Sequence, residues 1–186
     1  MEDARSYLID EQPAPDLLPY LKGRRSIRKF KPQSVPRELI DKIMEAGTWA
    51  PSAGNVQPWY LYLIFNRELK QRLAQAALEQ RFVGKAPLVI VVCADKSRAQ
   101  SSYGIRGETL YCIQDTASMV QNMLLETFSL GLGGCWVGAF REEDVKAALD
   151  MPHHLQPVAI LPIGYPDEKP GPRTRRDWRE TVKVIE

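Results

Sequence analysis

Two groups of arginine side chains in this sequence are suited to bind a phosphate. The first lies in the stretch RRSIRKF, from Arg24 to Phe30, which places three arginines and a serine within five residues. The second lies in PRTRRDWRE near the C-terminus and comprises Arg173, Arg175, Arg176 and Arg179. A guanidinium matches the planar spread of phosphate oxygens, and a serine hydroxyl adds another donor. Two such groups, far apart in the chain, could close around one phosphate in the fold.

The same arginines also fit other partners. A basic cluster is often only a solvated surface turn, and arginines also bind nucleic acids and lipid head groups. The chain has 25 Lys and Arg against 23 Asp and Glu, a formal net charge of +2, whereas nucleic-acid binders usually carry a larger basic excess. We therefore expect no nucleic-acid partner, and the solvated surface turn stays open as the alternative to a phosphate site.

A second polar segment is APSAGNVQPW, residues 50–59, which is dense in turn-forming residues. It offers Ser52, Asn55 and Gln57 as neutral hydrogen-bonding groups on a loop bounded by Pro51 and Pro58. It contains no catalytic dyad. Such a loop can line a polyhydroxyl chain or the edge of a heterocycle.

A third segment, LGLGGCWVGAF at residues 130–140, is rich in glycine. It is not a dinucleotide fingerprint, because Trp136 stands where the third glycine belongs and the segment follows a helix, not a strand. Gly131 fits a helix C-cap. We expect Gly133, Gly134 and Gly138 to let the backbone approach a flat ligand, so that an N–H can bond a ring nitrogen.

The sequence offers few reactive groups of its own. Its two histidines, His153 and His154, are adjacent in an expected loop, and no G-x-S-x-G occurs. The three cysteines, Cys93, Cys112 and Cys135, form no C-x-x-C pair, which argues against a disulfide framework and a cysteine-rich zinc site. We expect no metal, and we expect a bound cofactor to supply the reactive group.

The elements that must position these segments alternate along the chain. Apolar spacing and breakers predict helices at 14–22, 36–46, 67–79, 107–130 and 141–149, and strands at 60–65, 88–94 and 157–165, with 181–185 as a further edge strand. Gly23 and Gly47 are expected to end helices. This interleaving indicates an α/β or α+β class. The long apolar helix suits either a dimer core or burial within one chain.

Length and composition suggest one domain of ordinary globular type. The longest apolar run, LVIVVCA, is too short to span a bilayer, and the charged N-terminal residues lack an apolar segment of signal-peptide type. We therefore expect a cytoplasmic protein without a membrane partner.

Taken together, the segments resemble the nitroreductase family. RRSIRKF, APSAGNVQPW, LGLGGCWVGAF, and IGYPDEKP with PRTRR occur in family order over roughly residues 20–186. The resemblance implies an α+β fold, a nitroreductase-like three-layer sandwich with a central, mainly antiparallel sheet flanked by helices, in an intertwined homodimer. Residues 1–186 would form a single FMN-binding domain, with 1–20 as an N-terminal extension and 166–186 closing the FMN site.

The resemblance also implies roles at the phosphate end of a tightly bound, non-covalent FMN. Arg24 and Ser26 would hold the phosphate, and Arg25 is counted with them. Arg173 and Arg175 would close on it from the C-terminal segment.

At the ring end, the resemblance implies that Arg28 lies near N1 and O2, and that Gln80 reads the pyrimidine edge. Pro51, Ser52 and Asn55 would come from the partner subunit, and Ala53 and Gln57 of the same loop belong to the cofactor-binding set. Trp136, Val137, Gly138 and Ala139 would pass along the ring, with the Gly138 N–H near N5.

The implied activity is electron transfer from NAD(P)H through flavin N5 to a nitroaromatic, quinone or similar small acceptor, by a ping-pong mechanism. A specialised flavin enzyme of the same fold, flavin-fragmenting or dehalogenating, and a non-catalytic FMN-binding protein remain the alternatives. Residues 95–106 correspond to a compressed form of the helical insertion that covers the ring in longer members. Tyr103 and Arg106 could line the entrance, but a mobile loop is the alternative that we expect.

Overall fold

A computed structural model describes residues 16–186, so most of the expected N-terminal extension lies outside the described residues. A four-stranded sheet forms its centre, in the order β1-β2-β4-β3, with every neighbouring pair antiparallel. The strands are β1 (Trp59–Ile64), β2 (Leu88–Asp95), β3 (Gly133–Gly134) and β4 (Leu155–Gly164). The three main predicted strands are confirmed within a few residues.

Strand β2 divides the core into two halves. Residues 88–94 are all fully buried, because the side chains of a strand alternate between faces and helices cover both faces here. Val89, Val91 and Cys93 belong to one apolar cluster, whereas Leu88, Ile90 and Val92 belong to the other. The run of β-branched residues therefore forms a strand buried on both sides, as its sequence predicts.

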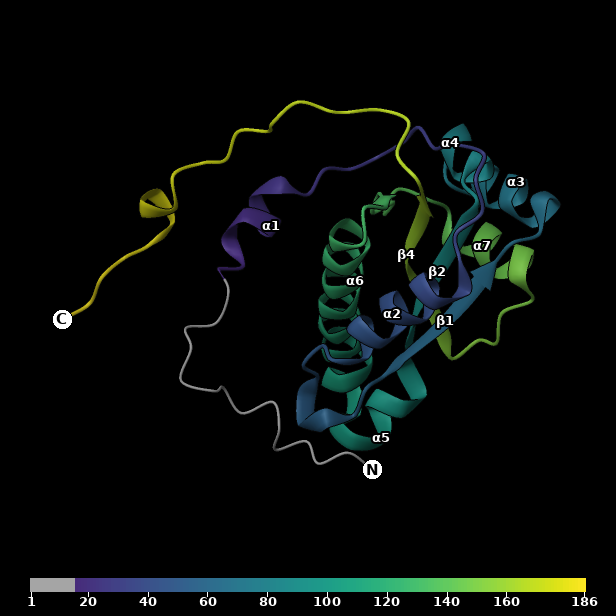
Figure 1. The fold of residues 1–186 in the computed structure, drawn as a ribbon. Helices are drawn as coiled ribbons and strands as arrows, with labels where there is room; N and C mark the ends of the chain where they lie inside the picture. Colours follow the sequence, from purple (N-terminus) through teal and green to yellow (C-terminus); the bar gives the residue numbers. More distant parts are fainter. Residues whose placement is uncertain (1–15) are drawn as a thin grey trace.

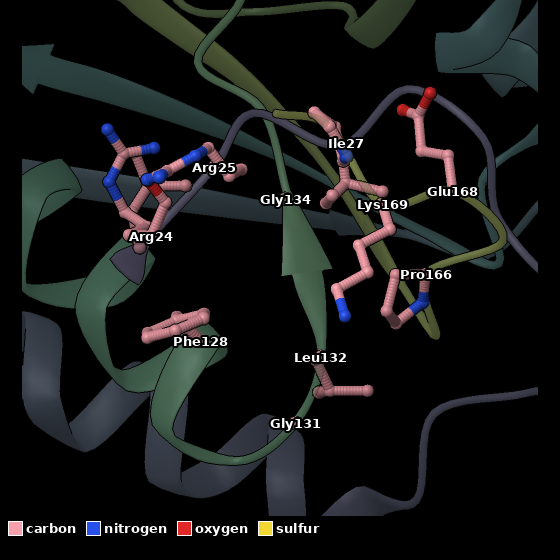
Figure 2. A pocket seen from close by; sticks show the side chains of 12 residues that line it. Arg24, Arg25, Ile27, Phe128, Gly131, Leu132, Gly134, Pro166, Glu168 and Lys169 are labelled. Atoms are coloured by element: carbon pink, nitrogen blue, oxygen red, sulfur yellow. The ribbon is translucent and has the colours of Figure 1, made fainter. Parts of the chain in front are cut away.

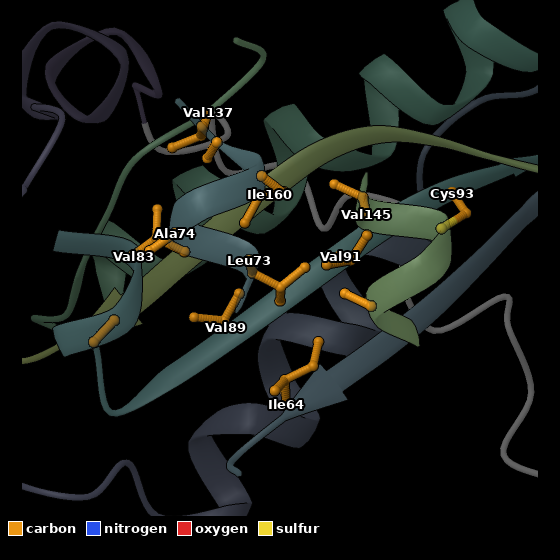
Figure 3. Packing of buried hydrophobic residues seen from close by; sticks show 14 of the residues in the cluster. Ile64, Leu73, Ala74, Val83, Val89, Val91, Cys93, Val137, Val145 and Ile160 are labelled. Atoms are coloured by element: carbon orange, nitrogen blue, oxygen red, sulfur yellow. The ribbon is translucent and has the colours of Figure 1, made fainter. Parts of the chain in front are cut away.

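Helices form a layer on each face of the sheet (Figure 1). On one face α3 (Arg67–Ala76), α4 (Arg81–Lys85) and α7 (Glu142–Leu149) contribute apolar side chains to the cluster drawn in Figure 3. On the other face α2 (Arg37–Thr48) and the long α6 (Cys112–Ser129) pack on the sheet. The predicted three-layer α+β sandwich is confirmed.

Two further segments complete the described chain. In chain order, the short helix α1 (Leu18–Gly23) and the turn η2 (Ala53–Asn55) precede the first strand. The turn η4 (Trp178–Thr181) lies near the C-terminus. Gly131, just after α6, has φ +74°, as a helix C-cap requires.

Residues 95–106 are not the expected mobile loop. They form helix α5 (Lys96–Arg106), followed by the π-helical turn η3 (Gly107–Tyr111), so the helix predicted at 107–130 is divided. The Asp95 side chain caps α5 by accepting from the backbone N–H of Arg98 at 2.9 Å. Lys96 and Glu108 then pair at 3.1 Å across the two elements. The Asp95 cap and the Lys96–Glu108 ion pair thus stabilise a helix where the polar composition indicated a mobile loop.

Three other expectations about elements are corrected. Gly23 ends α1 as expected, whereas Gly47 lies inside α2, whose last residue is Thr48. Helix α4 was not predicted from the sequence. The expected edge strand at 181–185 is not formed, and Val184 and Ile185 are 74% and 85% exposed, because no neighbouring strand in the described chain pairs with them.

Among residues 16–186, no helix combines the length and the apolar character that crossing a membrane would require.

Gly47 provides a test of the packing between α2 and α6. A Cβ atom at this position would lie 2.9 Å from Met123 Cγ and 3.0 Å from Met119 Cε. We expect Gly47→Leu to lower the free energy of unfolding by about 1–3 kcal/mol through overpacking, although glycine itself disfavours a helix by about 1 kcal/mol. Glu45→Leu, at an exposed position of the same helix, is the control. Urea unfolding measures both, and equal stability of the two variants would contradict the packing described.

Candidate functional site

The segment that carries the first arginine group is fixed by backbone pairing. Ser26 forms a parallel bridge with Gly134, and the Ile27 N–H donates to the Gly134 carbonyl at 3.0 Å. Further along, Phe30 bridges Pro166, and Lys31 N–H donates to Tyr165 O at 2.9 Å. The segment therefore runs between β3 and the chain that leaves β4, and it cannot shift without breaking these bonds.

The glycines of β3 serve this pairing. A Cβ at Gly133 would lie 2.6 Å from Ile27 Cγ1, and Gly134 is buried within the sheet. Their close approach is therefore to the protein's own chain and not to a flat ligand, which corrects the expectation for these two residues. Gly138, in contrast, is exposed, and a Cβ there would meet no atom closer than Trp136 Nε1 at 3.7 Å.

The two arginine groups come together in the fold. A hollow of about 260 Å³, called the arginine hollow below, is lined by Arg24, Arg25, Ser26, Arg28, Glu168, Pro170, Arg173 and Arg175. Residues separated by some 145 positions in the sequence thus share one cavity. Arg176 and Arg179 do not line it and pair instead with Glu180 and Asp177. Like charges gathered in one hollow repel, so the arrangement favours an anionic ligand.

An apolar cavity of about 190 Å³ adjoins the arginine hollow (Figure 2). Phe128 and Leu124 of α6 line it, together with Arg24 and Arg25. Figure 2 shows Arg24 and Arg25 on one side of this cavity and Glu168, Lys169 and Pro166 on the other. The arginine hollow therefore lies at the C-terminal end of α6.

The Arg25 side chain has a different role from its neighbours. Its Nη1 donates to the carbonyl groups of Lys22, Gly23 and Arg24 at 2.5, 3.1 and 2.9 Å, and its Nε donates to Gly171 O at 3.1 Å. These bonds tie the end of α1 to the C-terminal segment. Arg24, Arg28, Arg173 and Arg175 remain to meet a ligand, with Arg25 as the residue that holds the two segments together.

Glu168 is a residue of the hollow that the sequence analysis did not single out. Its Oε1 accepts from the backbone N–H groups of Arg28 and Lys29, at 2.5 and 3.0 Å. The Asp167 N–H donates to Lys29 O at 2.9 Å in the same contact. The sequence holds one signal for this residue: the acidic stretch PDEKP, residues 166–170, comes shortly before the second arginine group. Glu168 fixes the backbone from which the Arg28 side chain extends.

Residues 136–139, part of the glycine-rich segment, follow Cys135 beside the arginine hollow. Val137 pairs with Ile160 through two hydrogen bonds of 3.0 Å, while Gly138 and Ala139 are exposed. The Gln80 amide donates to Ala139 O at 3.0 Å and to Ala77 O at 2.9 Å. Gln80 therefore ties the start of α4 to this segment.

Arg28 and Cys135 connect this segment to the arginines. The Arg28 guanidinium lies 5.8 Å from the centroid of the Phe82 ring in α4. Burial raises the pKa of the Cys135 thiol, and the nearby charges of Arg28 and Arg24 oppose that rise without cancelling it. Cys135 is thus a protonated, inert thiol packed beneath the site.

The polar loop, residues 51–57, is placed elsewhere. Its Ala53 N–H donates to Asp115 Oδ1 at 3.1 Å, near the N-terminal end of α6. The arginine hollow adjoins Phe128 at the other end of that helix. Thirteen helical residues span about 20 Å. One chain therefore does not bring Pro51, Ser52, Ala53, Asn55 and Gln57 to the arginines.

Within residues 16–186, no group of three or more His, Cys, Asp or Glu side chains is placed to hold a metal ion. The three cysteines are buried and unbonded to one another.

The comparisons with known proteins agree with this geometry. The family model described as "Nitroreductase family" matches residues 21–83 and 78–165. The chain is 38% identical over 162 residues to a putative NADH dehydrogenase/NAD(P)H nitroreductase of Methanothermobacter thermautotrophicus, covering 85% of this chain and 81% of that protein. It is 30% identical over 166 residues to an FMN reductase (NADPH) of Bacillus subtilis, covering 82% of this chain and 67% of the relative.

A solved structure gives the same result. The NADPH:FMN oxidoreductase of Vibrio harveyi, in complex with NAD⁺, superposes with a TM-score of 0.83 at 28% identity. The match covers 91% of this chain and 76% of that one.

Glu168→Gln tests the electrostatics of the arginine hollow. The amide keeps an oxygen that can accept from Arg28 and Lys29 but removes a negative charge from the hollow. We expect inorganic phosphate to bind about threefold more tightly at low salt, since one charge at about 6 Å in water contributes roughly 0.7 kcal/mol. The gain should shrink at high ionic strength.

Glu45→Gln changes the net charge equally at an exposed position of α2 and serves as the control. Phosphate titration by calorimetry measures both variants. An unchanged phosphate affinity in Glu168→Gln would show that this carboxylate does not act on the hollow.

Proposed function

Because the chain belongs to the nitroreductase family, we propose that it is an FMN-dependent oxidoreductase that takes electrons from NAD(P)H. The observation that carries the proposal is the arginine hollow, in which two groups of arginines from opposite ends of the chain meet. The similarity to an FMN reductase and to an NADPH:FMN oxidoreductase supports FMN as the ligand and NAD(P)H as the donor.

The donor set of the hollow fits the phosphate end of FMN. A phosphate monoester carries nearly two negative charges, and Arg24, Arg28, Arg173 and Arg175 line one cavity with the Ser26 hydroxyl. We assign Arg24 and Ser26 to the phosphate, with Arg173 and Arg175 closing on it from the C-terminal segment. Arg25 supports this arrangement by holding α1 against Gly171.

The residues beyond the hollow suit the ring. We assign Arg28 to the N1 and O2 edge, where a fixed cation favours the negative charge of a reduced ring. Gly138 would offer its N–H to N5, because its exposed backbone has open space around it. Gln80, whose amide N–H groups donate to Ala77 O and Ala139 O, would present its amide oxygen to the pyrimidine edge.

When bound, the flavin supplies the redox chemistry, accepting hydride and passing electrons to an acceptor. The protein supplies position and charge. We propose a ping-pong cycle with nitroaromatics or quinones as acceptors, which would reach the ring beside the exposed residues Trp136 and Ala139.

We also propose a homodimer with two shared sites. The polar loop lies about 20 Å along α6 from the arginine hollow of its own chain. The partner's Ser52 and the partner's Asn55 would therefore complete each site, together with the rest of that loop. Exposed apolar side chains support a second copy: Trp49 is 73% exposed, and Leu17, Tyr20 and Val184 are also exposed.

The first test is the visible spectrum of the purified protein before and after anaerobic addition of NADH or NADPH. We expect the bands of bound oxidised flavin, and we expect them to bleach with at least one nucleotide. Bands that persist would leave a non-catalytic flavin protein. A colourless protein that cannot be reconstituted with FMN would refute the proposal.

Arg28→Ala tests the assignment at the ring. We expect FMN to remain bound and the midpoint potential of the two-electron couple to fall by about 30–60 mV, as loss of a charged hydrogen bond of about 1.5–3 kcal/mol implies. Arg28→Lys should recover part of that shift. Spectroelectrochemistry measures it, and an unaltered potential together with an unaltered reduction rate would show that Arg28 does not act on the ring.

A further inference from the structure

The polar loop is held from outside by three side chains of α5 and α6. We propose that Asp115, with Arg98 and Tyr103, forms a latch that sets the flavin-binding conformation of residues 51–57. Asp115 is then a positioning residue, one that acts on the flavin site through the loop and does not touch the ligand. The inference rests on the proposed function for its ligand but on this chain's own contacts for its geometry.

Asp115 is the buried member of the latch. Its side chain is 7% exposed and its Oδ1 accepts from the Ala53 N–H at 3.1 Å. In residues 16–186 no ion pair includes this carboxylate. Burial raises the pKa of Asp115, and the Ala53 hydrogen bond opposes that rise. A carboxylate that is costly to bury and meets a loop N–H is explained by the need to hold that loop.

The loop itself needs to be held. Gly54, Asn55 and Gln57 have φ of +54°, +56° and +55°, and for the two residues with side chains such backbone costs about 1–2 kcal/mol each. Ser52 Oγ accepts from the Gln57 N–H at 3.0 Å, which closes the loop on itself. Within the loop the Asn55 N–H also donates to Ser52 O at 3.0 Å and the Val56 N–H to Ala53 O at 3.1 Å, which leaves the Ala53 N–H and the Val56 carbonyl for groups outside the loop.

Arg98 and Tyr103 provide the other two contacts. Arg98 Nε donates to Val56 O at 2.6 Å. The Tyr103 hydroxyl lies so close over Gly54 that a Cβ there would be 2.1 Å from it.

Helix α5 is bent to allow this contact. Tyr103 has φ −134° and Gly104 has φ +57° with ψ −146°, a conformation almost confined to glycine. The Tyr103 ring also packs edge-on to Tyr111, with 5.4 Å between centroids. The bend at Gly104 therefore brings the Tyr103 side chain onto the loop.

The latch has a consequence at the other subunit. The loop conformation sets the positions of the Ser52 and Asn55 side chains. In the proposed homodimer, that loop contacts the partner's flavin. Asp115 of one chain would thus set the affinity of a site whose arginines belong to the other chain. Neither the phosphate nor the ring needs to contact Asp115.

Asp115→Ala is the variant that tests this, with Asp115→Asn as the conservative variant. The amide keeps an oxygen that can accept from Ala53 N–H, so Asp115→Asn should bind flavin within about threefold of wild type. Asp115→Ala removes the acceptor of that partly buried N–H and should weaken binding by about tenfold, near the low end of the cost of an unsatisfied donor. Thr116→Val removes a neighbouring buried hydroxyl, which bonds Cys112 O within α6, and is the matched control.

Each apoprotein is titrated with FMN and with riboflavin, following the quenching of flavin fluorescence. Because the loop would act away from the phosphate, Asp115→Ala should weaken both ligands by the same factor, whereas Arg24→Ala should weaken FMN alone. Loss confined to FMN, or wild-type affinity in Asp115→Ala, would overturn the latch. So would an Asp115→Asn protein as weak as Asp115→Ala.

Hydrogen exchange of the apoprotein gives a readout independent of flavin. Exchange in the peptide covering residues 51–57 should accelerate in Asp115→Ala and stay unchanged in Thr116→Val. If wild type fails to bind any flavin while this acceleration is present, the proposed function fails and the latch stands as a structural device. If exchange is unchanged, the latch itself is refuted.

Discussion

The backbone pairing of residues 26–31 with Gly134 on one side and with residues 165–167 on the other is the contact on which the rest of the site depends. Four guanidinium groups that face one hollow repel each other, and side-chain contacts alone would let them separate. Ladder bonds of 2.9–3.0 Å at Ile27, Lys31 and Asp167 hold the backbone instead. Gly133 makes this possible, since any side chain there would meet Ile27.

Acidic and carbonyl groups complete that framework. Glu168 accepts from the backbone N–H groups of Arg28 and Lys29, and Arg25 donates to four carbonyls through its Nε and Nη1. Glu168 and Arg25 thus hold the backbone in place, and the other arginines of the hollow remain available to a ligand. The Glu168 carboxylate places a negative charge inside the cationic hollow, which opposes the binding of an anion. When no anion is bound, the same charge reduces the repulsion among the arginines.

The long helix α6 sets the second constraint. It packs on the sheet through Met119, Val120 and Met123, so its direction is fixed by the core. Asp115 holds the polar loop at one end, and Phe128 adjoins the arginines at the other. The helix thereby keeps the polar loop and the arginine hollow of one chain apart, which is the observation behind the proposed shared site. Apolar residues on α1 and near the C-terminus are exposed in the single chain, as the proposed homodimer would require.

The sequence alone determined the α/β or α+β class, the buried strands and the candidate phosphate-binding segments, whereas the three-layer sandwich was expected from the family resemblance. Those features depend on local periodicity, as in residues 88–94, or on residue chemistry, as in RRSIRKF. Only the tertiary structure decided that Gly133 meets Ile27, that Arg25 binds carbonyls, that Glu168 belongs to the hollow, and that residues 96–106 are helical. Each of these depends on a partner distant in sequence or on a cap and an ion pair whose geometry is set by packing. Periodicity describes which face of an element is buried, and it carries no information about which residue lies opposite.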